Sequence, residues 1–243
     1  MNGDEGRSPP SYVPLLGCLT LALVVLFLCL LPFFLVELMQ RALEKLHLSP
    51  GMAFAMVMGI FVGGLFNIPI YHIPRVEEQT IEPISVYGAL VRSPQQVRRV
   101  RRDTIIAINV GGAIVPMGLL IYLLIHLIQD GGWPLAAFAL AGSANIAICY
   151  FAARPIGGIG IFLPGYVAPL VAVVATWILL PGGEYESVRA PVAFCAGVLG
   201  PLVGADALHL RDILRVPVGM LSIGGAGTFD GIVLAGVLAA FLA

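Results

Sequence analysis

The chain has 243 residues, of which 59% are hydrophobic and only 11% are charged, and its formal net charge is -1. Soluble domains carry about a quarter charged residues, so this composition excludes an ordinary soluble domain. The near-neutral charge gives no reason to expect nucleic acid as a partner. We therefore expect an all-α fold, a polytopic bundle of transmembrane helices whose surroundings are the lipid bilayer.

Apolar segments follow one another along the whole chain. Residues 1–11 form a polar tail, 12–49 hold a first span with an amphipathic extension, and 50–243 form the membrane domain. The first apolar run is too long for a signal peptide, which predicts a retained span. About seven spans are expected, some broken by glycine and proline, although 155–180 could instead be a re-entrant element. They cover roughly 12–38, 51–71, 104–128, 134–153, 159–180, 191–209 and 228–243.

One long polar segment, 75–103, contains RSPQQVRRVRRD and six arginines. If the spans alternate in direction, ten Lys and Arg residues fall on one side of the membrane and three on the other. Cytoplasmic loops carry an excess of Lys and Arg. The asymmetry predicts a multi-pass protein of the cell membrane, with the N-terminus and this basic loop in the cytoplasm and the C-terminus outside.

The four cysteines lie within apolar runs and form no CxxC pair. We read them as small buried side chains. The sequence predicts no metal site, no disulfide framework and no cofactor.

Ionisable groups inside a membrane are costly, so each is a functional candidate. Asp206 and His209 lie three residues apart in the sixth span and share a helix face. That spacing suits a metal, a proton relay or, more commonly, a local hydrogen bond near the helix end. Asn109 and Arg154 lie within or at the ends of spans, where an interhelical hydrogen bond and a contact with lipid headgroups are the simpler explanations.

Asp230 follows the glycine-rich stretch SIGGAG at the start of the last span. An aspartate at this position predicts a helix N-cap. Gly224, Gly225 and Gly227 permit a tight turn with positive φ before the helix, or close packing against a neighbour. Pro164 is expected to shape the backbone in the same way within IGGIGIFLPGYVAP.

Only 23 residues separate Asp206 from Asp230, so their helices should be neighbours with the two carboxylates facing each other. A facing pair can bind a proton or a cation, and it can also share one proton for acid–base hydrolysis. Intramembrane aspartyl proteases use such a pair, with one aspartate in a Gly-x-Gly-Asp motif. This chain resembles them only loosely, because Thr228 and Phe229 intrude before Asp230.

Three functional hypotheses follow. The main one is a transporter or channel-like protein whose aspartate pair handles a proton, a cation or a small solute. The alternatives are an intramembrane aspartyl hydrolase and a non-catalytic assembly or structural factor, so enzymatic activity is left open. Substrate, transport direction and oligomeric state do not follow from the sequence.

Four stretches, NIPIYHIP, ARPIGGIGIFLPGYVAP, VLGPLVGADALHL and SIGGAGTFDGI, resemble a family of prokaryotic membrane proteins catalogued as domain of unknown function 1614. The resemblance covers about residues 50–243, and SIGGAGTFDGI is its most specific part. It implies an integral membrane protein and assigns no catalytic residue.

Overall fold

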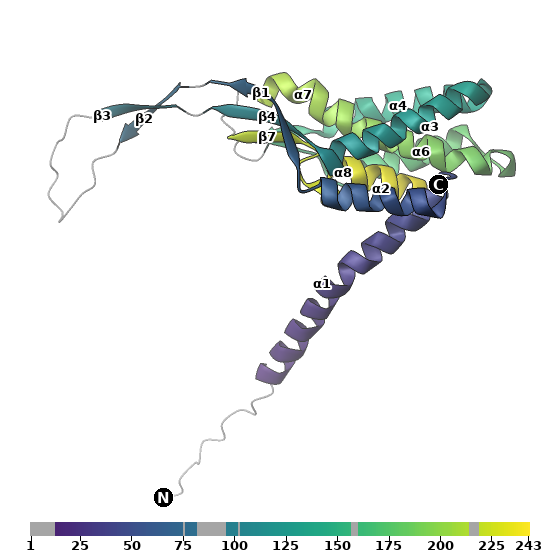
Figure 1. The fold of residues 1–243 in the computed structure, drawn as a ribbon, viewed down its shortest axis with the longest axis horizontal. Helices are drawn as coiled ribbons and strands as arrows, with labels where there is room; N and C mark the ends of the chain where they lie inside the picture. The colour runs from purple at the N-terminus through teal and green to yellow at the C-terminus, as the bar shows by residue number, and fades with distance from the viewer. Residues whose placement is uncertain (1–12, 75, 82–95, 102, 157–159, 214–218) are drawn as a thin grey trace, which may run out of the picture. The chain divides into compact units, whose positions relative to one another are not determined.

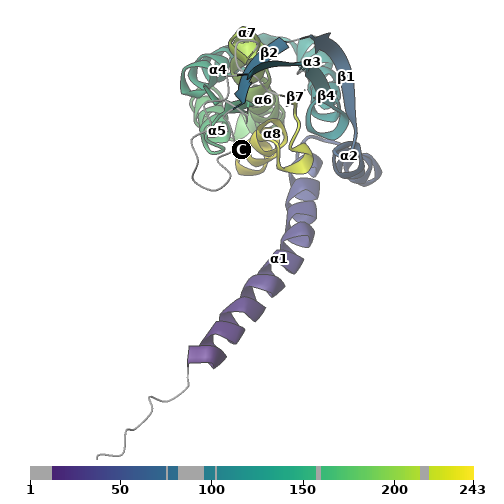
Figure 2. The ribbon, with the colours of Figure 1, turned by 90° about the vertical axis from the view of Figure 1, so that its left-hand side faces the viewer.

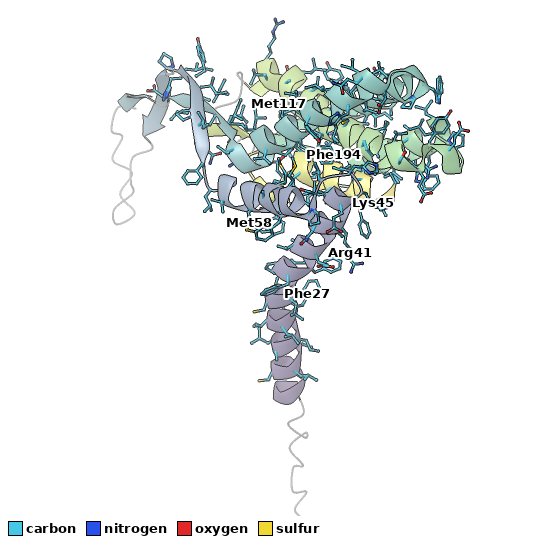
Figure 3. All side chains as sticks on the ribbon, turned by 45° about the vertical axis from the view of Figure 1, so that its right-hand side comes forward. Phe27, Arg41, Lys45, Met58, Met117 and Phe194 are labelled. Atoms are coloured by element: carbon cyan, nitrogen blue, oxygen red, sulfur yellow. The ribbon has the colours of Figure 1, made fainter. Side chains whose placement is uncertain are left out.

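The structure is a computed structural model that describes residues 13–74, 76–81, 96–101, 103–156, 160–213 and 219–243. The chain divides into two compact parts, residues 1–39 and 40–243. Helix α1 (Val13–Glu44) supplies most of the first part. Most of its apolar side chains between Leu19 and Phe34, Phe27 among them, project outward and are more than half exposed (Figure 3). An exposed apolar surface on a helix of this length suits contact with lipid.

Four helical segments in the described residues are long and apolar enough to cross a membrane, and three more are apolar but shorter. The confirmed feature is therefore the helix bundle, while the number of crossings stays a prediction. A helix of 14 residues is about 21 Å long, shorter than the roughly 30 Å of a bilayer core. The long segments are Gly17–Glu44, Val110–Asp130, Gly132–Ala152 and Gly183–Asp212, and the short helices are α2 (Pro50–Gly63), α5 (Val167–Leu179) and α8 (Gly231–Leu242).

Helix α6 (Glu186–Leu199) is the centre of the second part. It packs against α3 (Val115–Asp130), α4 (Gly132–Ala152), α5 and α8 (Figure 2). Small residues allow this close packing: a Cβ added at Gly197 would lie 2.7 Å from the Ala235 carbonyl oxygen on α8. Phe194, on the same helix, is buried among the helices (Figure 3). The core therefore depends on backbone approach, as in other membrane bundles.

A three-stranded sheet lies at one end of these helices (Figure 1). Its order is β1-β4-β7, with β1 (Asn67–Ile73) antiparallel and β7 (Met220–Ile223) parallel to the central strand β4 (Thr104–Asn109). Two further pairs are antiparallel: β2 (Val76–Ile81) with β3 (Gln96–Arg101), and β5 (Arg154–Ile156) with β6 (Gly160–Phe162).

These strands were not predicted. The expected span over 104–128 begins with strand β4 and becomes helical only at Val110. The expected loop over 75–103 contains β2 and β3, and its residues 82–95 lie outside the described residues. A continuous apolar run such as TIIAIN does not distinguish a buried strand from a helix, which explains the error.

Asn109 joins the sheet to the helices. It is fully buried and caps the short π-helix η1 (Val110–Ile114), where its Oδ1 accepts a hydrogen bond from the Gly112 N–H at 2.7 Å. Its Nδ2 donates to the Gly64 carbonyl at 2.9 Å and to Asn67 Oδ1 at 3.1 Å. Every polar atom of this side chain amide is thus used in connecting β4 to β1 and to the end of α2.

Arg189 closes the opposite end of the second part. It is buried, and its Nε and Nη2 each donate to the Leu180 carbonyl at 3.1 Å, with a further bond from Nη2 to the Gly182 carbonyl. Its guanidinium carbon lies 4.0 Å from the centre of the Trp177 ring. The arginine therefore caps the C-terminus of α5, where cations are favoured, and stacks on an aromatic side chain.

Replacing Arg189 with methionine should lower the free energy of unfolding by about 2 kcal/mol, because charge-assisted bonds to buried carbonyls are lost. Lysine should restore only part of this stability, because it lacks the planar guanidinium group that donates several hydrogen bonds in a fixed geometry. Thermal unfolding in detergent measures both variants. A methionine variant as stable as wild type would contradict the capping role.

Candidate functional site

A cavity of about 420 Å³ lies between the helices and the sheet. One wall comes from β6, the π-helix η3 (Gly200–Ala207) and α7 (Leu208–Ile213). The other wall comes from β7 and the turn that precedes α8. Asp206 and Asp230 both line this cavity. The structure thus brings together the two carboxylates that the sequence singled out.

Asp206 stands on η3, which continues α6 with a wider turn. Pro201 follows Gly200 at its start and has no N–H to continue an α-helical ladder. The η3 backbone lies directly against α4: a Cβ at Gly204 would be 2.3 Å from the Ile146 carbonyl oxygen. No described residue donates a hydrogen bond to Asp206. Wide turns of this kind are often found at functional sites.

Asn145 on α4 supports η3 from behind. It is fully buried, and its Nδ2 donates to the Ala196 carbonyl at 2.8 Å and to the Ala168 carbonyl at 3.1 Å. A Cβ at Gly200 would lie 2.5 Å from this nitrogen. The amide therefore ties α4 to α5 and α6 next to the position where η3 begins, as expected of an interhelical hydrogen bond.

Asp230 is the N-cap of α8, as its position in the sequence predicted. Its Oδ1 accepts a hydrogen bond from the Ile232 N–H at 2.9 Å, and its Oδ2 accepts one from the Ala226 N–H at 3.3 Å. The first bond caps the helix, and the second closes the turn that leads to it. Both oxygens are therefore held in place at the cavity wall.

Two glycines of this turn have positive φ, Gly224 at 70° and Gly227 at 60°. Gly224 also packs closely against helix η1, because a Cβ at this position would lie 2.5 Å from the Gly112 carbonyl carbon. Gly225 differs, since its φ is not positive, but a Cβ would lie 2.8 Å from the carbonyl oxygen of Ser222. The turn thus combines left-handed backbone with close packing.

Alanine at Gly227 should destabilise the protein by about 1 kcal/mol or more, because φ is positive and the new Cβ would lie 3.1 Å from the Gly64 Cα. Gly231, the first residue of α8, is the matched control, since no atom lies within 4 Å of a Cβ there. Thermal unfolding of the two alanine variants should separate them. Equal stability would rule out a conformational requirement at Gly227.

The three other candidates for a substrate or ion site, and Pro164, are absent from the described residues that line the cavity. His209 is buried, its Nδ1 lies 3.0 Å from the Ala205 carbonyl oxygen, and its ring centre is 4.7 Å from that of Tyr150. This is the local hydrogen bond near a helix end that the sequence offered as the alternative to a relay. Arg154 is exposed on β5, and Asn109 serves the network described above. Pro164 lies between β6 and α5, where its carbonyl accepts the Val167 N–H at 3.0 Å.

Strand β7 is the part of the site that sequence reasoning missed. Its four residues all line the cavity, and Ser222 Oγ donates to Asn67 Oδ1 at 2.5 Å. The signal was the short run MLSI bounded by Gly219 and Gly224, which is typical of a strand. Among the described residues, no group of three or more His, Cys, Asp or Glu side chains is placed to hold a metal ion.

A family model described as "Protein of unknown function (DUF1614)" matches residues 61–242. The match includes both aspartates, the sheet and the glycine turn. No curated protein and no solved structure matches the chain. Its apolar helices agree with a membrane protein, and by the extent of the match the chain belongs to the DUF1614 family of proteins of unknown function.

Proposed function

We propose that this chain is a membrane-embedded hydrolase in which Asp206 and Asp230 act as an acid–base pair on an amide bond. The observation that carries the proposal is that both carboxylates line one cavity. Two neighbouring carboxylates do not both ionise readily, and we assign to Asp206 and Asp230 a state in which the pair holds one proton. Such a pair offers a base and an acid in the same site.

The surroundings of the two groups suggest their roles. Asp230 accepts two backbone N–H bonds, which stabilise its ionised form, so we assign it as the base. Asp206 accepts no hydrogen bond from a described residue, so we assign it the shared proton. Asp230 takes a proton from water as the water oxygen bonds to the carbonyl carbon. Asp206 protonates the amide nitrogen as the C–N bond breaks, giving a carboxylic acid and an amine.

A proton- or cation-coupled transporter is the second candidate. It is favoured by the absence of Lys and Arg among the described lining residues, which leaves the two acids without a basic partner in the cavity.

A second cavity of about 400 Å³ is lined by different residues, including His47 and His126. Between the helices, Ala193, Ala196 and Ala239 are fully buried. This close packing favours hydrolysis over transport.

Purified protein in lipid nanodiscs, incubated with a set of apolar peptides, tests the proposal. We expect new amino termini to appear with wild type and not with the double variant Asp206→Asn/Asp230→Asn. The same proteins in liposomes with an imposed pH gradient test transport. Gradient dissipation that requires both aspartates, without peptide cleavage, would replace the hydrolase by the transporter.

We also propose the orientation that the arginine distribution predicts, with the C-terminus outside the cell membrane and the segment 75–103 in the cytoplasm. Because β1 and β4 flank that segment and belong to the sheet beside the cavity, the aspartates would then face the cytoplasmic side. Reporter fusions after Ala243 and within 82–95 measure both locations. A cytoplasmic C-terminus would mean that one of the short helices does not cross.

A further inference from the structure

We infer that an extended, apolar peptide segment binds this site by pairing with the edge of strand β7 that faces away from β4, which places the peptide backbone across Asp206 and Asp230. The inference rests on the proposed function and names its substrate class. It is carried by the position of β7, which is at once the last strand of the sheet and a wall of the cavity.

The backbone of β7 has hydrogen-bonding groups to offer. The Gly219 carbonyl accepts the Ile105 N–H at 3.1 Å, which fixes the edge that faces β4. Successive residues of a strand direct their backbone groups to opposite edges, so Met220 and Ser222 direct theirs away from β4. The Ser222 carbonyl is used by the Gly225 N–H at 3.0 Å. Among the described residues, none bonds to either backbone group of Met220 or to the N–H of Ser222, so these groups can pair with an added strand.

The two edges of the sheet differ in how readily they could accept an added strand. Strand β1, at the other edge, contains Pro69 and an irregular register between Pro69 and Tyr71. Proline and bulges are common means of blocking edge pairing. Strand β7 contains neither proline nor charge, and no described strand pairs with its second edge. The edge beside the carboxylates is therefore the one left open for strand addition.

The walls around this edge select the peptide's side chains. Leu221 packs against Ile161 and Leu210, which cover one face of β7. Leu163 and Ile232 add further apolar surface to the cavity. An added strand would therefore place apolar side chains against these residues. Its amide groups would face β7, near Asp206 on η3 and Asp230 before α8.

The first test compares Met220→Pro with Met220→Ala in the full-length protein. Met220 is the first residue of β7 and its side chain is 54% exposed, a position where proline is tolerated. Proline removes the N–H offered to the substrate, whereas alanine keeps it. We expect Met220→Pro to lower kcat/KM for an apolar peptide about fivefold or more, and Met220→Ala to change it little. Cleavage that is equally sensitive to both changes would overturn the strand-pairing inference and leave the hydrolase intact.

The second test does not need cleavage. A peptide with ¹³C-labelled carbonyls is bound to the Asp206→Asn variant and followed by isotope-edited infrared spectroscopy. We expect the labelled amide I band to shift to the β-sheet position, and to stay at its free-peptide position when Met220→Pro is added. A β-sheet shift without cleavage by wild type would overturn the hydrolase alone. No shift, or a shift unaffected by Met220→Pro, would overturn the pairing.

Discussion

Replacing Gly112 with alanine is expected to prevent the protein from accumulating in its folded form. A Cβ at Gly112 would lie 2.0 Å from the Gly224 carbonyl oxygen, so the clash is between the backbone segments that carry these two glycines. Neither can move easily: the Gly112 N–H is bonded to Asn109, and Gly224 is held at a φ of 70°. We expect a loss of about 3 kcal/mol or more, a large share of the stability of a typical domain.

Size-exclusion chromatography and thermal unfolding in detergent measure this effect. Gly118 on α3 is the control, because it is exposed and no atom lies within 4 Å of a Cβ there. Alanine at Gly118 should leave the protein unchanged or raise its stability by up to about 1 kcal/mol. Should Gly112→Ala yield monodisperse protein with the Tm of wild type, the contact between η1 and the turn before α8 would be incorrect.

The helices could be predicted because composition and segment length determine them. Runs such as 134–153 are uniformly apolar and correspond closely to α4. The N-cap at Asp230 could also be predicted, since an aspartate directly before an apolar helix has one simple structural role. These features are local, so residues close in the sequence are sufficient to specify them.

The sheet could not be predicted, because it depends on pairing between distant segments. Residues 67–73, 104–109 and 220–223 come from three parts of the chain, and each lies within or beside an apolar run. Ile105 and Ile106 are β-branched, which favours a strand, but helices in membranes contain the same residues. Whether such a segment becomes a strand or a helix depends on the strands with which it can pair, and the sequence does not indicate which segments these are.

Within the site, the position of Asp206 and Asp230 on one cavity agrees with the short connection between them. The role of β7 did not, because the same four residues could be a loop before a helix. Arg189 was counted only toward membrane topology, whereas it is buried and caps α5. Its partners, the Leu180 and Gly182 carbonyls, are backbone groups, and a sequence gives no sign of which carbonyls a helix end leaves open.

Asparagine at Asp206 or at Asp230 should each lower peptide hydrolysis by about 10²- to 10⁴-fold, the usual contribution of a general acid or base. The two positions should differ in stability. Asparagine is as good an N-cap as aspartate, so Asp230→Asn should unfold at the temperature of wild type. Alanine there removes the bonds to the Ile232 and Ala226 N–H groups and should cost about 1 kcal/mol in addition to the activity.

Asp130→Asn is the control, since Asp130 is exposed at the end of α3 and lines the other cavity. It should keep both activity and stability. The comparison separates charge from capping, because Asp230→Asn removes only the charge whereas Asp230→Ala removes both. If Asp230→Asn kept full activity while Asp230→Ala lost stability, Asp230 would be a structural cap alone and the acid–base pair would be excluded. If both Asn variants were folded but inactive, the two carboxyl groups would be needed for the reaction and not for the fold, which is the outcome that a shared-proton pair requires.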